Sequence, residues 1–283
     1  MRFARVGSKG RETPVAIIPD TGLAWDLSQI TSDIDGAFLS RWRDHESTIA
    51  SGSLPQIDLT DIRFGAPIAR PQAVYAIGLN YLSHAAETQM QAPSEPVVFS
   101  KAPNSICGPN DDVVLPPGAT KGDWEVELGI VISSPAYRLE SESESLEVIA
   151  GYLLANDVSE RVWQLEHGTQ WLKGKSFPTA NPIGPFLATA DEVEPGGLIL
   201  SLSVNGQQRQ AGSTADMIFS VEHIVWYLSQ FVQLEPGDLI NTGTPDGVGL
   251  GMKPPQFLKD GDVMELAITG LGSQRSRVRI PTE

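Results

Sequence analysis

Short apolar segments, separated by glycine and proline, run along most of the chain. Several of them alternate apolar and polar residues, which is the period of a β-strand with one face against a core. The strand candidates are AVYAIGL, PVVFSK, DVVLP, WEVELGIVI, VIAGYLLAND, LILSLSVNG, GDLINTGT and DVMELAITG. Their density predicts a mainly β fold with a few helices, of the α+β class.

One longer segment, SVEHIVWYLSQFVQLEPGD, has apolar residues at helical spacing instead. Val221, Val225 and Leu228 fall on one face of a helix with a period of 3.6 residues. Ser220 is suited to cap its N-terminus, and Pro236 is expected to end it. A second, shorter helix is expected in SERVWQLEHG.

The pattern changes near residues 66–71, where GAPIARPQ places two prolines before an apolar run. Residues 1–70 contain two strand-like runs, RFARV and PVAIIP, and a polar, helical stretch around residues 37–50. They predict a small N-terminal domain. Residues 71–283 hold the strand candidates and the clearest helix, and are expected to form the larger domain.

The segment KGDWEVELGIVI places three carboxylates, Asp123, Glu125 and Glu127, on one side of a strand. A solvated face is the usual explanation of such a pattern. The acidic side ends at Gly129, however, and like charges two residues apart repel unless a cation lies nearby. A further carboxylate, Asp157, ends the apolar run GYLLAND. Glu125, Glu127 and Asp157 are therefore candidate ligands of a metal ion.

The chain carries 20 Lys and Arg against 35 Asp and Glu, a formal net charge of −15. This charge argues against nucleic acid or an anionic membrane as a partner. An anionic substrate would need a local positive centre, and a metal held by the three carboxylates would supply one. Oxygen ligands favour Mg²⁺ or Mn²⁺ over zinc, and calcium is the main competitor, although the DxDxDG loop of an EF-hand is absent.

The single cysteine, Cys107, excludes an intrachain disulfide and a cysteine-rich zinc site. It fits a reducing compartment, so a cytoplasmic location is expected. The N-terminal MRFARVGSKGRET lacks an apolar core, and no uninterrupted apolar run is long enough to span a bilayer. Neither export nor membrane insertion is expected.

Several motifs, in this order, resemble those of the fumarylacetoacetate hydrolase family. They are GLNYLSHAAE, PVVFSKAPNSICGP, DWEVELGIVI, NDVSERVWQ, KGKSF and TGTPDGVG. The resemblance implies a mixed β-sandwich or roll with a small N-terminal domain, and it makes residues 71–283 the catalytic domain. It also implies that Glu125, Glu127 and Asp157 bind a divalent metal, in agreement with the interpretation of the carboxylates alone.

The resemblance implies roles for five further residues. His84 and Glu87 are similar to the family's water-activating pair, and Lys175 is similar to its charge-stabilising lysine. Gln164 and Thr244 match positions that contact the keto-acid end of the substrate or nearby oxygens. A His and a Glu three residues apart share one face of a helical turn, so that the carboxylate can orient the imidazole. Without the resemblance, such a pair is more often a surface hydrogen bond.

Two positions depart from the pattern of the family. Pro178 follows KGKSF, and Val162 follows SER, where relatives often have acidic residues. Neither position carries the expected chemistry. His84 and Glu87, which directly precede the segment TQMQAPSEP, also fit a lid that closes over the site.

The implied activity is that of a Mg²⁺-dependent hydrolase that cleaves the C3–C4 bond of a 2,4-diketo acid, with the metal as electron sink. The C-terminal half is most similar to hydrolases of 2,4-diketo-3-deoxy sugar acids of the L-rhamnonate or L-fuconate type, which would yield pyruvate and lactate. The alternatives are a fumarylpyruvate or other acylpyruvate hydrolase, a 2-oxo acid isomerase or decarboxylase, a ureidoglycolate lyase, and a non-catalytic protein with a structural cation. A small anionic 2-oxo acid is the expected partner, and a homodimer is the expected assembly.

Overall fold

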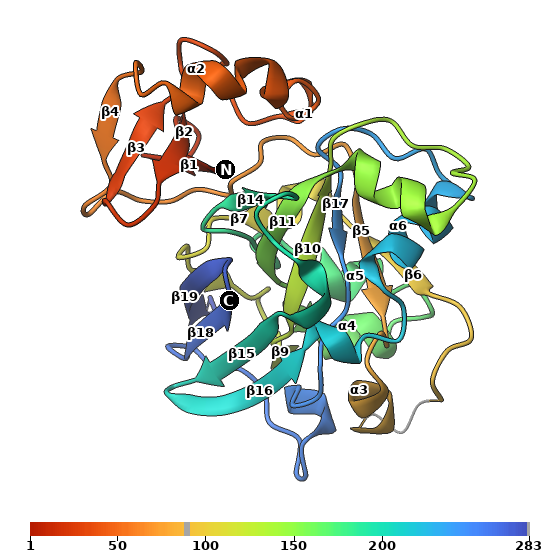
Figure 1. Ribbon diagram of the computed structural model, residues 1–283. Coiled ribbons are helices and arrows are strands. Elements are labelled where there is room, and N and C mark those ends of the chain that lie inside the picture. Colours follow the sequence, from red (N-terminus) through yellow and green to blue (C-terminus); the bar gives the residue numbers. More distant parts are fainter. Residues whose placement is uncertain (88–90, 282–283) are drawn as a thin grey trace.

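The computed structural model describes residues 1–87 and 91–281, and its largest feature is one long β-sheet (Figure 1). Within these residues the sheet has ten strands. From one edge to the other they are β4 (Gln56–Asp58), β3 (Leu23–Asp26), β2 (Thr13–Ile18), β1 (Arg2–Val6), β14 (Leu187–Thr189), β11 (Ile149–Asn156), β10 (Val126–Ile132), β17 (Leu239–Asn241), β5 (Val74–Gly78) and β6 (Val97–Lys101). The prediction of a mainly β fold is confirmed.

A second sheet lies against the middle of the first and shares a hydrophobic cluster with β10. In the described part of the chain its five strands are, in order, β16 (Gln207–Ser213), β15 (Ile199–Val204), β18 (Val263–Ile268), β19 (Gly272–Arg279) and β8 (Val113–Val114). Two short ladders join β12 (Ser159–Glu160) to β9 (Gly122–Asp123) and β13 (Asn181–Pro182) to β7 (Ile106–Cys107).

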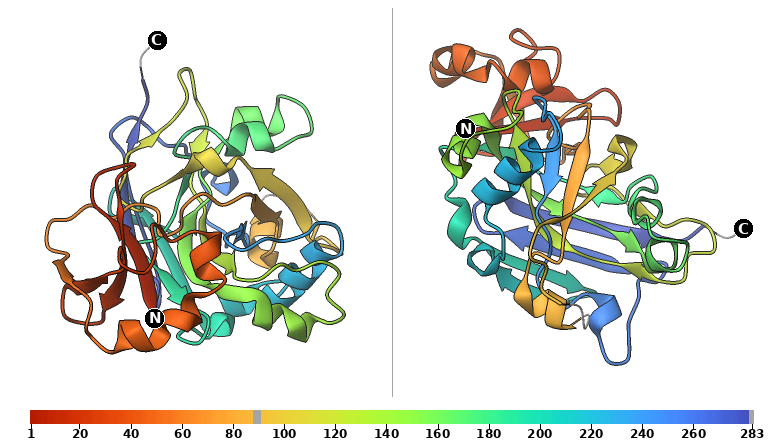
Figure 2. Two further views of the ribbon diagram at one scale, coloured as in Figure 1. Left: turned by 90° about the horizontal axis from the view of Figure 1, so that it is seen from above. Right: turned by 90° about the vertical axis from the view of Figure 1, so that its right-hand side faces the viewer.

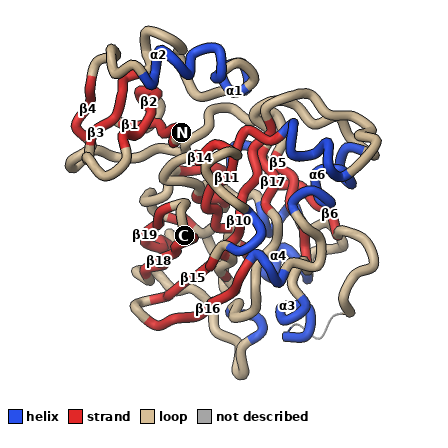
Figure 3. Tube along the Cα trace, in the orientation of Figure 1, coloured by secondary structure: helices blue, strands red, loops and turns tan. Residues whose placement is uncertain are grey.

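The helices are short, and several of them gather beside β5, β6 and β17 (Figure 3). The α-helices are α1 (Gly36–Leu39), α2 (Glu46–Ala50), α3 (Leu82–Glu87), α4 (Arg161–Leu165), α5 (Leu172–Lys175) and α6 (Val221–Ser229). The 3₁₀ helices are η1 (Trp42–His45), η2 (Pro103–Ser105), η3 (Glu142–Val148), η4 (Pro195–Gly197), η5 (Thr214–Asp216) and η6 (Gly249–Gly251). Among the described residues, no helix has the length and apolar content needed to cross a bilayer.

Helix α6 begins as the sequence predicts and ends earlier. The side chain of Ser220 accepts a hydrogen bond from the backbone N–H of His223 (3.2 Å), which is the predicted N-cap. The helix ends at Ser229, because the chain turns there and forms a bridge between Leu234 and Ala136. The predicted end at Pro236 is therefore wrong. The helix predicted in SERVWQLEHG is confirmed as α4.

The acidic strand is interrupted between Asp123 and Val126, so that β9 and β10 are separate strands. All of β10 is buried, which confirms that a solvated face does not explain its carboxylates. Each face of β10 packs in its own hydrophobic cluster, Leu128 in one and Val131 in the other. A covered second face explains why the acidic pattern stops after Glu127.

The N-terminal strands continue the large sheet, because β1 pairs with β14 (Arg2 opposite Ala188). They lie at the end of the molecule opposite α3, as Figures 1 and 2 show. Arg63 and Asp111 add an ion pair between the residues before and after the predicted boundary (2.7 Å). The division into residues 1–70 and 71–283 stays a prediction.

Strand β11 has to pass close to β14, which makes Gly151 sensitive to any side chain. A Cβ at Gly151 would collide with the carbonyl oxygen of Ala188, a backbone atom that cannot move aside. We expect Gly151→Ala to lower the free energy of unfolding by about 1–3 kcal/mol, as overpacking does. Urea unfolding measures this change. Gly197→Ala is the matched control, since no atom lies within 4 Å of its added Cβ; equal effects of the two changes would contradict the explanation.

Candidate active site

Three buried carboxylates from neighbouring strands meet near the centre of the large sheet. Glu125 lies between β9 and β10, Glu127 lies in β10, and Asp157 directly follows β11. The antiparallel ladder places Val126 opposite Asn156, and the N–H of Asp157 donates to the carbonyl of Glu125 (2.9 Å). One oxygen from each of the three side chains lies within 4.8 Å of the others. The structure thus brings together the three predicted metal ligands, and their role as ligands stays a prediction.

Two buried lysines contact these carboxylates. Lys175, the predicted charge-stabilising residue, places its Nζ 2.7 Å from Glu125 and 2.8 Å from Asp157. Lys101 places its Nζ 2.5 Å from the other oxygen of Asp157, and both side chains of this pair are fully buried. Lys101 was missed at the sequence level. Its signal is a lysine at the end of the apolar run PVVFSK, the same anomaly that drew attention to Asp157.

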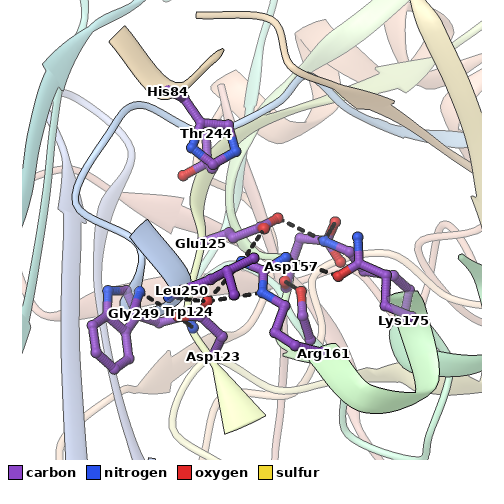
Figure 4. Close-up of polar contacts among 12 residues, drawn as sticks. His84, Asp123, Trp124, Glu125, Asp157, Arg161, Lys175, Thr244, Gly249 and Leu250 are labelled. Carbon is purple, nitrogen blue, oxygen red and sulfur yellow. Dashed lines mark hydrogen bonds and ion pairs between the residues drawn. The ribbon is translucent and has the colours of Figure 1, made fainter. Parts of the chain in front are cut away.

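Arg161 is, after Lys101, the second cationic residue of the site that was not predicted from the sequence. Its Nε lies 2.8 Å from Asp123, and its Nη2 lies 2.8 Å from Glu125 (Figure 4). Its Nη1 donates to the side-chain oxygen of Gln164 (2.9 Å). One buried guanidinium therefore joins a candidate metal ligand to a predicted substrate-binding residue.

Asp123, whose role the sequence left open, is fully engaged with the protein. Besides Arg161, its carboxylate accepts hydrogen bonds from the backbone N–H groups of Trp124 (2.9 Å), Gly249 (2.7 Å) and Leu250 (3.0 Å). Asp123 is thus the partner of a cation, Arg161. Through its hydrogen bonds with Gly249 and Leu250, Asp123 also holds η6 at the edge of the site.

The surrounding charges shift the pKa values of Glu125 and Glu127 in opposite directions. Burial raises the pKa of Glu125, but Lys175 and Arg161 outweigh it and lower the pKa to about 2. Burial together with Asp157 and Glu125 raises the pKa of Glu127 well above its ordinary value. Within the described residues Glu127 accepts one hydrogen bond, from the N–H of Gly243 (2.8 Å), and forms no ion pair. Glu127 is therefore the carboxylate whose charge a bound cation would compensate most.

The predicted His84–Glu87 pair lies on α3 at the border of the same site. Nδ1 of His84 is 3.6 Å from an oxygen of Glu87. Both oxygens of Glu87 also lie 3.1 Å from the backbone N of Gly247, which joins α3 to the loop after β17. Figure 4 shows the ring of His84 on one side of Glu125, and Arg161 and Lys175 on the other. Residues 88–90, which begin the segment TQMQAPSEP after the predicted lid residues His84 and Glu87, lie outside the described residues.

Gln164 and Thr244, the predicted substrate contacts, are both buried and border the same cavity. The hydroxyl of Thr244 donates to the carbonyl of Val126 (2.9 Å) and accepts from the side-chain amide of Gln210 (2.8 Å). Thr244 therefore holds the loop after β17 against β10. A contact of either residue with a substrate stays a prediction.

A cavity of about 160 Å³ lies over the carboxylates. Its lining residues are Ile77, Gly78, Leu79, His84, Phe99, Glu125, Glu127, Arg161, Gln164, Leu165, Trp171, Lys175, Thr244 and Leu250. Leu79 has a left-handed backbone (φ 57°), which costs a non-glycine residue about 1–3 kcal/mol. The next residue, Asn80, holds this conformation through hydrogen bonds to Phe219 and to the carbonyl of Thr242 (2.8 Å). The backbone is thus strained where it borders the cavity.

Comparison with known proteins agrees with this geometry. The family model described as fumarylacetoacetate (FAA) hydrolase C-terminal matches residues 73–279. The chain is 47% identical over 280 residues to a 2,4-didehydro-3-deoxy-L-rhamnonate hydrolase of Sphingomonas sp. (strain SKA58), and the match covers 98% of this chain and 96% of that protein.

Solved structures give the same picture. A fumarylacetoacetate hydrolase from the psychrophilic Exiguobacterium antarcticum is 35% identical, with a TM-score of 0.85 over 99% of this chain and 100% of the other. A maleylpyruvate hydrolase from Sphingobium sp. SYK-6, solved in complex with manganese(II) ion and pyruvate, is 25% identical, with a TM-score of 0.83 over 100% of both chains. The chain therefore belongs to the fumarylacetoacetate hydrolase family and is an enzyme that acts as a hydrolase.

Proposed function

We propose that this enzyme uses a divalent metal to hydrolyse the C3–C4 bond of a 2,4-dioxo acid. The substrate we infer is 2,4-didehydro-3-deoxy-L-rhamnonate, which is 5-hydroxy-2,4-dioxohexanoate, and the products are pyruvate and lactate. One observation carries the proposal: two members of a buried cluster of three carboxylates, Glu125 and Glu127, line the same cavity as His84, which lies beside Glu87. The 47% identity to a hydrolase of that name supports the choice of substrate.

The residues present fit a hard divalent cation. In the described part of the chain, the buried cluster holds four carboxylates against three cations, so that one negative charge is in excess when all are ionised. The carboxylates are Asp123, Glu125, Glu127 and Asp157, and the cations are Lys101, Arg161 and Lys175. A bound ion would reverse this excess and favour an anionic substrate. Oxygen donors point to Mg²⁺ or Mn²⁺.

When bound by Glu125, Glu127 and Asp157, the metal supplies Lewis-acid polarisation of the 2-oxo acid end of the substrate. The side chains do the rest. His84 takes a proton from water, and the resulting hydroxide adds to the C4 carbonyl. Glu87 orients the imidazole from α3.

The C3–C4 bond then breaks. Its electron pair passes into the enolate of pyruvate, and the second product leaves as a carboxylic acid. C3 receives a proton to give pyruvate. Lys175 and Arg161 keep positive charge at the wall of the cavity where the negative charge develops. A homodimer, which the family resemblance implies, and a cytoplasmic location, which the single cysteine suggests, stay proposals.

The reaction is tested directly by product analysis. With Mg²⁺, the purified enzyme should release equimolar pyruvate and lactate from 5-hydroxy-2,4-dioxohexanoate, identified by mass. His84→Ala should lower kcat by about 10²- to 10⁴-fold, the range of a lost general base. His167→Ala, at an exposed position, is the matched control and should keep full activity. Equal or faster turnover of ureidoglycolate would contradict the proposed substrate, and a fully active His84→Ala enzyme would contradict the mechanism.

Metal binding is tested separately from turnover. Glu127→Gln removes a candidate ligand, so Mn²⁺ affinity should fall by more than about tenfold, which is the lower range seen for residues that only support ligands. Titration followed by electron paramagnetic resonance of free Mn²⁺ measures the affinity. Glu166→Gln, an exposed carboxylate paired with Lys121, should leave it unchanged. Unaltered Mn²⁺ binding by Glu127→Gln would exclude this residue as a ligand.

The buried lysine Lys101 should matter for stability as well. Lys101–Asp157 and Lys121–Glu166 have the same N–O distance of 2.5 Å, but the first pair is fully buried and the second is 38% and 54% exposed. Removing one partner of a buried pair typically costs about 3–5 kcal/mol, against about 0.2–1 kcal/mol for an exposed pair. Lys101→Met should therefore lower the midpoint of urea unfolding far more than Lys121→Met. Similar midpoints for the two variants would show that the burial of the Lys101–Asp157 pair does not increase its contribution to stability.

A further inference from the structure

The cavity over the carboxylates is lined by charged and by apolar side chains. The charged end is formed by Glu125 and Glu127 with Arg161 and Lys175. The remaining lining includes six apolar side chains, which we call the apolar wall: Ile77, Leu79, Phe99, Leu165, Trp171 and Leu250. Phe99 is the member next to the charged end, with its ring centre 5.3 Å from Nζ of Lys175. A 2,4-dioxo acid held by its carboxylate at the charged end would place the group beyond C4 against this wall.

Trp171 closes the apolar wall over Gly78. A Cβ at Gly78 would lie 2.6 Å from the indole ring, so that only glycine lets the ring approach β5 this closely. The ring of Trp171 also meets Phe99 edge to face, with 5.2 Å between centroids. Trp171 is the N-cap residue of α5, the helix that ends at Lys175. Helix α5 therefore contributes Trp171 to the apolar wall and Lys175 to the charged end of the cavity.

Leu165 and Leu250 complete the wall from two other segments. Leu165 ends α4 directly after Gln164 and is 46% exposed, so it lies at the border between cavity and solvent. Leu250 is held in place by its backbone N–H, which donates to Asp123 (3.0 Å).

The cations of the cavity are already engaged. Among its described lining residues, the lysine and arginine side chains are those of Arg161 and Lys175, and both contact Glu125 at 2.7–2.8 Å. The apolar wall contributes no charged side chain to pair with a second carboxylate. The net charge of −15 opposes the approach of a dianion as well.

We propose that the apolar wall makes this enzyme selective for 2,4-dioxo acids whose acyl part is short and uncharged, and excludes those with a distal carboxylate. The proposal rests on the proposed function. A carboxylate pressed against Trp171 and Leu165 would lose its water without gaining a partner, whereas the methyl end of 5-hydroxy-2,4-dioxohexanoate loses nothing there. Trp171 and Leu165 are thus specificity residues.

The first measurement compares kcat/KM for acetylpyruvate and fumarylpyruvate with saturating Mg²⁺. Acetylpyruvate should be favoured by roughly 100-fold or more, because the site leaves the second carboxylate unpaired. Comparable values for the two substrates would overturn the selectivity and leave the proposed function standing. Release of pyruvate from neither substrate, nor from 5-hydroxy-2,4-dioxohexanoate, would overturn both.

A pair of matched substitutions tests the position of the wall. Leu165 and Leu172 are 46% and 43% exposed and belong to adjacent short helices, but Leu172 borders a separate surface groove. Leu165→Arg should raise kcat/KM for fumarylpyruvate relative to acetylpyruvate at least about tenfold, since it offers a partner to the distal carboxylate. Leu172→Arg adds the same charge to the protein and should leave the ratio unchanged. Equal shifts in both variants would show a general charge effect and overturn the proposal.

Trp171→Ala provides an independent measurement. Removing the indole should lower kcat/KM for acetylpyruvate and raise it for benzoylpyruvate, whose ring needs the vacated space. Affinities measured by calorimetry in a His84→Ala background, with Mg²⁺, should change in the same directions without turnover. An unchanged ratio of the two acylpyruvates in both measurements would exclude Trp171 as a specificity residue.

Discussion

The pairing of β10 with β11 is the constraint on which the site depends. Its register sets Val126 opposite Asn156, and the residues just outside the ladder, Glu125 and Asp157, then lie side by side. A slip of one residue would turn every side chain of one strand to the other face and remove Asp157 from Glu127. Both strands are buried on both faces, so such a slip would also misplace the core. The hydrophobic core thereby determines the geometry of the carboxylates.

Carboxylates brought together in this way repel one another, and cationic side chains from three other segments compensate their charge. Lys101 comes from the end of β6, Arg161 from the start of α4 and Lys175 from the end of α5. The pair of Lys101 joins the end of β6 to Asp157, and the pairs of Arg161 and Lys175 hold α4 and α5 against the large sheet, so electrostatic balance also positions the short helices. Among the residues that the structure describes, Glu127 is the carboxylate of the cluster without a paired cation, so a divalent ion fits this charge distribution best there. Folding and chemistry therefore use the same charges.

Much of the site and of the fold could be predicted from the sequence, because the key residues stand out from the apolar or helical pattern around them. Asp157 ends an apolar run, and Ser220 precedes a helical period, so both can be recognised without a partner. Lys101 stands out in the same way as Asp157 and could have been found. The interruption between β9 and β10 could not, since the alternation runs through Trp124 and Val126 without a break. The junction of β1 with β14 depends on residues nearly 190 positions apart, which no local pattern encodes.

The proposed chemistry and the proposed selectivity depend on different residues. The carboxylates belong to a sheet whose register the core determines. The apolar wall takes Ile77 and Phe99 from strands of the same sheet, whereas Leu165, Trp171 and Leu250 come from short helical segments. Trp171 depends on the close approach at Gly78, and Leu250 depends on one hydrogen bond to Asp123. The two parts meet on α5, where Trp171 precedes Lys175 by four residues. A change that widens the apolar end by moving α5 would also move Lys175 away from the carboxylates. Selectivity is therefore altered with the smallest loss of activity by substituting side chains of the wall, rather than by shifting the helix.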